Sequence, residues 1–141
     1  MAYKILIMGL PGSGKTTFAE KLISKLTSTL WLNADNIRES HNDWDFSKEG
    51  RLRQAHRLTD LSNESDCNIV VCDFIAPLAE HRDIFNADYM IWMNTISAGI
   101  FKDTNTIFEP PKEVDYMIVD FNSSLELHIT NILKTAICLN I

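Results

Sequence analysis

The sequence predicts an α/β domain of three layers, α/β/α, with a mostly parallel five-stranded sheet at its centre. Two observations lead to this prediction. Short apolar runs typical of buried strands alternate with segments whose apolar residues recur at helical spacing. A glycine-rich segment also stands between the first apolar run and the first helical segment. We treat residues 1–141 as one domain, because 141 residues with 45% hydrophobic content suffice for one core.

The predicted strands are rich in β-branched and other apolar residues, which is typical of a sheet covered on both faces. They cover residues 3–8, 30–33, 68–74, 89–93 and 116–119. The predicted helices begin at capping residues or after a proline. They cover residues 16–26, then 48–64 with Ser47 as N-cap, 77–85 opened by Pro77, and 125–136 behind a capping-box pattern at residues 123–126.

Residues 9–16 match the pattern G-x-x-x-x-G-K-[ST] of a phosphate-binding P-loop. Its glycines let successive backbone N–H groups point at one anion, and the following helix adds the positive end of its dipole. In this pattern Lys15 reaches the β- and γ-phosphates, and the hydroxyl of Thr16 binds Mg²⁺. The motif therefore predicts a P-loop NTPase fold that binds ATP and Mg²⁺. The predicted ATP-binding residues are Gly9, Leu10, Pro11, Gly12, Ser13, Gly14, Lys15, Thr16 and Thr17.

The segment NADNIR, residues 33–38, follows the second predicted strand, at the edge where open α/β sheets bind ligands. A carboxylate at Asp35 can polarise an acceptor hydroxyl or hold Mg²⁺, and Arg38 can hold an anionic group of the acceptor. The alternative is an Asx turn in which Asp35 only caps a helix. Asp73 follows the third strand and is predicted either to bind Mg²⁺ through water or to be a plain cap.

Arg51, Gln54 and Arg57 recur at three-residue spacing on the predicted polar helix, and Phe46 lies just before it. An aromatic face beside guanidinium groups suits a nucleotide acceptor, because the ring stacks on a base and arginine pairs with phosphate. The alternatives are a solvated helix face and a Phe46 side chain in the core.

Charge and composition narrow the classes of partner. A net charge of −6 argues against a broad nucleic-acid-binding surface, whereas the arginines all lie between residues 38 and 82. We therefore expect a local anion pocket and a small-molecule ligand, with no nucleic-acid partner. No apolar run is long enough to span a bilayer, and we expect no signal peptide and a cytoplasmic location.

The cysteines and histidines show no metal-ligand spacing. The cysteines are Cys67, Cys72 and Cys138, and their odd number favours reduced thiols. The histidines are His41, His56, His81 and His128, which we expect on the surface or in the core.

The sequence resembles the adenylylsulfate kinases, which phosphorylate the 3′-hydroxyl of adenosine 5′-phosphosulfate. The likeness rests on GLPGSGKTT (9–17), NADNIR (33–38), DFSKEGRLRQAHRL (45–58) and FIAP (74–77). It implies that Asp35 is the catalytic carboxylate, that Phe46 stacks on the adenine and that Ile75 lies in the substrate-facing loop. It also implies that the phosphosulfate contacts are Arg38, Arg51 and Gln54. The candidate catalytic residues are Asp35, Lys15 and Arg38.

The sequence departs from this family in the lid. Where the family has a long segment rich in arginine and lysine, only residues 96–100 separate Thr95 from Phe101. Phe101 is the candidate for the family's lid phenylalanine, and Lys102 is the one basic residue between Arg82 and Lys112. Two further differences are Asn33 in place of an acid and Ala79 in place of an arginine. The predicted substrate-binding residues are Asp35, Arg38, Phe46, Arg51, Gln54, Ile75, Phe101 and Lys102, and the predicted Mg²⁺ ligands are Thr16, Asp35 and Asp73.

The sequence thus predicts an ATP-dependent kinase that phosphorylates a hydroxyl of a small anionic nucleotide such as adenosine 5′-phosphosulfate. A homodimer is an open possibility, since a partner chain could supply missing lid residues. One alternative is another hydroxyl kinase, similar to the polynucleotide 5′-kinases, which the net charge of −6 disfavours. The other is a nucleotide-binding regulatory protein without a lid, which the short connection favours and the retained acceptor residues disfavour.

Overall fold

A parallel sheet forms the centre of the molecule. The computed structural model describes residues 2–99, 101–120 and 124–137. The strands lie in the order β2-β3-β1-β4-β5, and each neighbouring pair is parallel. They are β1 (Tyr3–Met8), β2 (Thr29–Asn33), β3 (Ile69–Asp73), β4 (Tyr89–Met93) and β5 (Tyr116–Ile118). The predicted fold class is confirmed, and the described sheet is wholly parallel.

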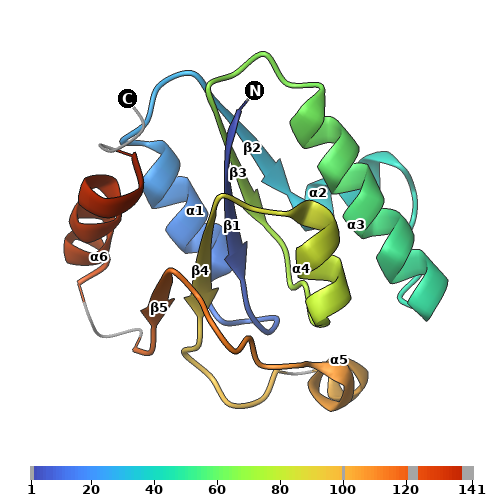
Figure 1. The fold of residues 1–141 in the computed structure, drawn as a ribbon. Coiled ribbons are helices and arrows are strands. Elements are labelled where there is room, and N and C mark those ends of the chain that lie inside the picture. The colour runs from blue at the N-terminus through green and yellow to red at the C-terminus, as the bar shows by residue number, and fades with distance from the viewer. Residues whose placement is uncertain (1, 100, 121–123, 138–141) are drawn as a thin grey trace.

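Helices cover both faces of the sheet, with α1 and α6 on one side and α3 and α4 on the other (Figure 1). The helices are α1 (Lys15–Ile23), α2 (Ala34–Ser40), α3 (Lys48–Asn63), α4 (Ala79–Phe85), α5 (Lys102–Ile107) and α6 (Leu125–Ile132). A π-helical turn, η1 (Leu133–Ile137), continues α6.

Strand β1 joins the two halves of the core. Its side chains alternate between the faces of the sheet, as in any strand. Ile5 and Ile7 pack with α1 and α6, whereas Leu6 and Met8 pack with α3 and α4, and all four are fully buried. Removing four such side chains from water stabilises the fold by about 2 kcal/mol each.

Several predicted boundaries shift. The helix predicted to reach residue 26 ends at Ile23, although Leu26 still packs on the core. Pro77 does not open α4, because Leu78 occupies its N-cap position. Ser124 caps α6 by accepting a hydrogen bond from the Leu127 backbone, and Ser123 of the predicted capping box lies outside the described residues. The sequence reasoning did not predict α2 or α5.

The described cysteines carry no disulfide between them: Cys72 is buried and Cys67 is half-buried. Cys138 lies outside the described residues. Within the described ranges, no helix combines the length and the apolar character that crossing a bilayer requires.

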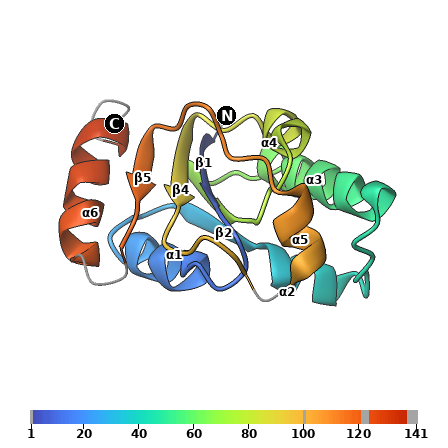
Figure 2. The ribbon, with the colours of Figure 1, turned by 90° about the horizontal axis from the view of Figure 1, so that it is seen from below.

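All five strands end at the same edge of the sheet, which Figure 2 views from below. The loop between β1 and α1, the start of α2 and the end of β3 all lie at this edge, and α5 lies on the side of α3. In parallel α/β sheets this is the edge at which ligands bind.

Candidate active site

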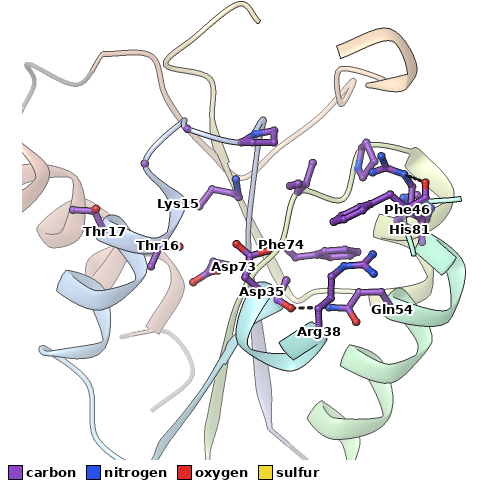
Figure 3. A pocket seen from close by; sticks show the side chains of 17 residues that line it. Lys15, Thr16, Thr17, Asp35, Arg38, Phe46, Gln54, Asp73, Phe74 and His81 are labelled. Carbon is purple, nitrogen blue, oxygen red and sulfur yellow. Dashed lines mark hydrogen bonds between the residues drawn. The ribbon is translucent and has the colours of Figure 1, made fainter. Parts of the chain in front are cut away.

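A cavity of about 480 Å³ opens at the carboxyl ends of the strands. It joins the glycine-rich loop to the acceptor residues predicted on α2 and α3 (Figure 3). Its lining residues are Pro11, Gly12, Gly14, Lys15, Thr16, Thr17, Ala34, Asp35, Arg38, Phe46, Arg51, Gln54, Asp73, Phe74, Ile75, Pro77 and His81.

The glycine-rich loop has the backbone conformation of a phosphate cradle. Gly12 and Gly14 have φ angles of +86° and +96°, which side chains rarely allow. A Cβ atom at Gly12 would meet only the Ile96 side chain, 3.9 Å away, and both Gly12 and Gly14 line the cavity. The residues present therefore fit a polyphosphate held by backbone N–H groups and by the start of α1.

Lys15 lies at the loop end of the cavity, and its Nζ donates to the Leu10 carbonyl oxygen at 3.0 Å. Burial lowers the pKa of Lys15 to about 8, and the nearby carboxylates of Asp73 and Asp35 only partly oppose this shift. A buried ammonium with a lowered pKa is stabilised by an arriving anion, so the site favours phosphate.

A buried hydrogen-bond chain holds Asp73 at the end of β3. Asn33 Nδ2 donates to Asp73 Oδ1 at 2.7 Å and lies 3.2 Å from Thr16 Oγ1. Trp31 Nε1 donates to Asp73 Oδ2 at 2.8 Å. Burial raises the pKa of Asp73 to about 6, against the lowering effect of the Trp31 hydrogen bond and Lys15. A cation near Asp73 would reverse this shift.

Asp35 is the second residue of α2 and lines the cavity. The cap of α2 is Asn33, whose Oδ1 accepts from the Asn36 backbone N–H at 2.9 Å. The alternative that Asp35 only caps a helix is therefore wrong. Its carboxylate faces the cavity between Lys15 and Arg38 (Figure 3).

The oxygen donors at this end suit Mg²⁺, which takes one or two carboxylates and completes its shell with phosphate oxygens and water. The three predicted Mg²⁺ ligands, Thr16, Asp35 and Asp73, all line the cavity, and their binding of the metal stays a prediction. Among the described residues no group of three or more acidic, histidine or cysteine side chains forms a self-sufficient metal site. The donor set thus fits a metal that arrives with a nucleotide.

Two arginines hold Phe46 at the other end of the cavity. Arg38 Nη1 donates to the backbone carbonyls of Asp43 and Asp45, at 3.0 and 3.1 Å. Arg51 Nε donates to the carbonyl of Phe46 at 2.9 Å. Phe46 is 46% exposed, so the alternative that placed it in the core is wrong.

Gln54 is fully buried, and both ends of its amide are engaged. Its Nε2 donates to the Ala34 carbonyl at 2.9 Å, and its Oε1 accepts from Arg57 Nη1 at 2.9 Å. Arg57 lies outside the cavity lining and also pairs with Asp43 at 2.9 Å. Gln54 therefore joins α3 to the start of α2, and its side chain is held in one position where it lines the cavity.

Not every predicted site residue lines the cavity. Gly9, Leu10 and Ser13 belong to the glycine-rich loop but are not among the lining residues. Phe101 is 56% exposed, and both it and Lys102 stand outside the lining. Their contact with a substrate stays a prediction.

The short connection after β4 is attached to the glycine-rich loop. Thr95 Oγ1 donates to the Ser13 carbonyl at 2.7 Å, and a Cβ atom at Gly99 would lie 3.0 Å from the Pro11 carbonyl oxygen. Farther along, Thr104 on α5 lies 3.4 Å from Arg51 Nη2. Thr95 thus contacts the glycine-rich loop, and α5 contacts the acceptor side of the site through Thr104.

The sequence reasoning did not single out the chemistry of Phe74 or His81. The stretch FIAP marked residues 74–77 as similar to a known segment, which was the available signal for Phe74. His81 is 1% exposed and had no signal, because its place depends on how α4 packs against α3.

Comparison with known proteins identifies a family and several similar structures. The sequence matches the adenylylsulphate kinase family over residues 1–105. A probable adenylyl-sulfate kinase of Aeropyrum pernix is 32% identical over 87 residues, which are 57% of this chain and 48% of that protein. The chain thus spans about half the length of the curated relative it matches.

Two solved structures show the same fold. The Mycobacterium tuberculosis APS kinase CysC in complex with AMPPNP and APS has a TM-score of 0.73 at 23% identity, covering 94% of this chain and 96% of that chain. Shikimate kinase from Acinetobacter baumannii in complex with shikimate has a TM-score of 0.66 at 15% identity, covering 100% and 96%.

Proposed function

The chain belongs to the adenylylsulphate kinase family, and we propose on that premise that it is an ATP- and Mg²⁺-dependent kinase. The proposed reaction transfers the γ-phosphate of ATP to a hydroxyl of a small anionic nucleotide such as adenosine 5′-phosphosulfate. The observation that carries the proposal is that one cavity joins a phosphate cradle to an end built from arginines and an aromatic ring.

At the donor end, the backbone of residues 9–16 and the ammonium of Lys15 would hold the β- and γ-phosphates. Thr16 and Asp73 are the proposed Mg²⁺ ligands, and Asp35, on the same cavity wall, would contribute a further carboxylate to the metal's surroundings. When bound, the metal neutralises charge on the transferring phosphate.

Asp35 stands between the two ends, which is the place where transfer has to occur. The acceptor hydroxyl oxygen forms a bond to the γ-phosphorus, and the bond from that phosphorus to the β,γ-bridging oxygen breaks, releasing ADP. The hydroxyl proton passes to a carboxylate oxygen of Asp35, the general base in this scheme.

The acceptor end suits an anionic nucleotide. Arg38 and Arg51 are 5% and 7% exposed, so their guanidinium groups sit in a largely dehydrated wall. Charge-assisted bonds from such groups to an oxyanion are stronger than neutral ones. The half-exposed ring of Phe46 offers a face on which a base can stack.

The short lid bears on how well the site excludes water. A closed lid protects a transferring phosphate from hydrolysis in many kinases. Here Thr95 donates a hydrogen bond to the glycine-rich loop, and no described residue after His81 lines the cavity. We propose that a second copy of the chain or α5 itself covers the site during transfer.

The deciding experiment is transfer from ATP·Mg²⁺ to adenosine 5′-phosphosulfate, with the product resolved by chromatography. Lys15→Ala serves as the blank, because it removes the cation at the phosphates while leaving the fold's core untouched. Product from the wild type that vanishes in the blank supports the proposal. ATP binding without product would leave the phosphate cradle standing and reject this acceptor, in favour of another hydroxyl or a regulatory nucleotide-binding role.

A further inference from the structure

His81 is a buried side chain of the cavity wall that the proposed reaction does not use. It lies in α4 and lines the cavity with 1% of its surface exposed. Its ring packs tilted against Phe74, with the two ring centres 6.4 Å apart. In Figure 3 His81, like Phe46, lies toward the end of the cavity away from Lys15.

The two nitrogens of the ring have different surroundings. The backbone N–H of Leu78 donates to His81 Nδ1 at 3.4 Å, so Nδ1 is an acceptor. Nε2 has no hydrogen-bond partner among the described residues. When Nδ1 accepts, the proton of a neutral imidazole resides on Nε2, which makes Nε2–H a donor.

Burial, with the nearby guanidinium groups, keeps the ring neutral. Burial lowers the pKa of His81, and the guanidinium groups of Arg51 and Arg82 lower it further. Glu80 and Glu109 oppose this shift without reversing its direction. His81 therefore stays uncharged near neutral pH, and its Nε2–H persists as a neutral donor.

The end of the cavity around Phe46 and His81 offers hydrogen-bond donors and no carboxylate. Of the two carboxylates in the lining, Asp73 lies at the end nearer Lys15, and Asp35 lies between the two ends, on the helix that carries Arg38. Around Phe46 the lining instead carries the His81 imidazole and the guanidinium groups of Arg38 and Arg51. A flat ligand that stacks on Phe46 and presents an acceptor atom at its edge complements this arrangement; an edge that carries only amino groups does not.

We propose that His81 is a specificity-determining residue at which Nε2–H donates a hydrogen bond to a ring nitrogen of the acceptor's purine base. This inference rests on the proposed function, because it takes the acceptor to be a purine nucleotide. His81 also accepts the Leu78 hydrogen bond at the start of α4, so its structural and recognition roles have to be separated.

Two substitutions separate the structural role of His81 from its role in recognition. His81→Asn places an amide oxygen near the position of Nδ1, which keeps the bond from Leu78 and removes the donor at Nε2. His81→Gln reaches the position of Nε2 with an amide and loses the Nδ1 acceptor. We expect His81→Asn to raise the KM for adenosine 5′-phosphosulfate about three- to tenfold, with kcat and the KM for ATP nearly unchanged. His81→Gln should keep the acceptor KM close to wild type and lower the Tm. His56→Asn, at an exposed histidine of α3, is the matched control.

The decisive measurement does not depend on catalysis. Calorimetry compares the binding of AMP with that of its 1-deaza, 3-deaza and 7-deaza analogues, in wild type and in His81→Asn. We expect one deaza analogue to lose about three- to tenfold in affinity for wild type and almost nothing for His81→Asn. If AMP does not bind, or if no analogue distinguishes the two proteins, the assignment of His81 is overturned even in an active kinase. If this dependence appears while adenosine 5′-phosphosulfate is not phosphorylated, the proposed reaction fails and His81 keeps its role.

Discussion

The guanidinium carbon of Arg38 lies 4.3 Å from the centre of the Phe46 ring. A guanidinium at this distance is attracted to the ring's negative face, and its planar shape lets it stack. The same group donates to two backbone carbonyls of the segment before Phe46. Arg38 thus sets the position of the ring on which an acceptor base is proposed to stack.

Arg38→Lys tests this relationship. Lysine keeps the charge but cannot donate along two directions in one plane, so Phe46 loses part of its support. We expect the acceptor KM to rise about tenfold or more, and the free energy of unfolding to fall by about 1–3 kcal/mol. Steady-state kinetics and urea unfolding measure the two effects. Arg53→Lys, at an exposed ion pair with Asp43, is the control and should change acceptor KM little.

Asp35→Asn separates nucleotide binding from transfer. The substitution keeps the shape of the side chain and removes its ability to take the acceptor's proton. We expect ATP binding within about threefold of wild type and a loss of kcat of about a hundredfold or more. Calorimetry and product analysis measure the two quantities. Transfer at the wild-type rate would show that another group takes the proton.

Binding of metal-free ATP should weaken as the pH rises. The pKa of Lys15 is lowered to about 8, so the ammonium is largely charged at about pH 7 and largely neutral at about pH 9. The charged form attracts the phosphates, and affinity is therefore lost as the pH passes upward through this pKa. We expect a decrease of roughly tenfold over that interval, measured in EDTA. Lys15→Met should bind weakly at both values, and an equally steep decrease in that variant would contradict the assignment.

Trp31→Phe tests the support of Asp73. The indole N–H donates to the Asp73 carboxylate, and phenylalanine fills most of the space without donating. Losing this bond leaves the carboxylate held by Asn33 alone, so its orientation becomes less fixed. We expect the Mg²⁺ concentration for half-maximal activity to rise about three- to tenfold, while ATP affinity in EDTA stays unchanged. An unchanged Mg²⁺ dependence would mean that Asp73 does not act through the metal.

The strands and the glycine-rich loop could be predicted because their signals are local. Apolar runs such as residues 3–8 define a strand by composition, and the loop pattern carries its own geometry. Helices α2 and α5 could not be predicted in this way, because the sequences ADNIRES and KDTNTI have no apolar stripe. Their place follows from the Asn33 cap and from the packing around Thr104.

In the candidate site, too, some residues have a local sequence signal and others depend on tertiary packing. Asp35 and Arg38 were predicted from a short motif, and both line the cavity. The bonds that Arg38 makes to residues 43–45, and the burial of His81 beside Phe74, join segments that the sequence gives no reason to pair. Such contacts depend on how α2, α3 and α4 pack together, which periodicity does not encode.

The segment of residues 43–46, which forms part of the acceptor end of the cavity, is held in place before any ligand binds. Four arginines fasten residues 43–46: Arg38 and Arg51 through backbone carbonyls, and Arg53 and Arg57 through the Asp43 carboxylate. The segment therefore becomes ordered as the chain folds, before an acceptor arrives. A ligand that meets a preorganised wall loses less free energy to ordering on binding, so a few contacts suffice for affinity. For a chain with so short a lid, this rigidity offers selectivity that does not depend on closure.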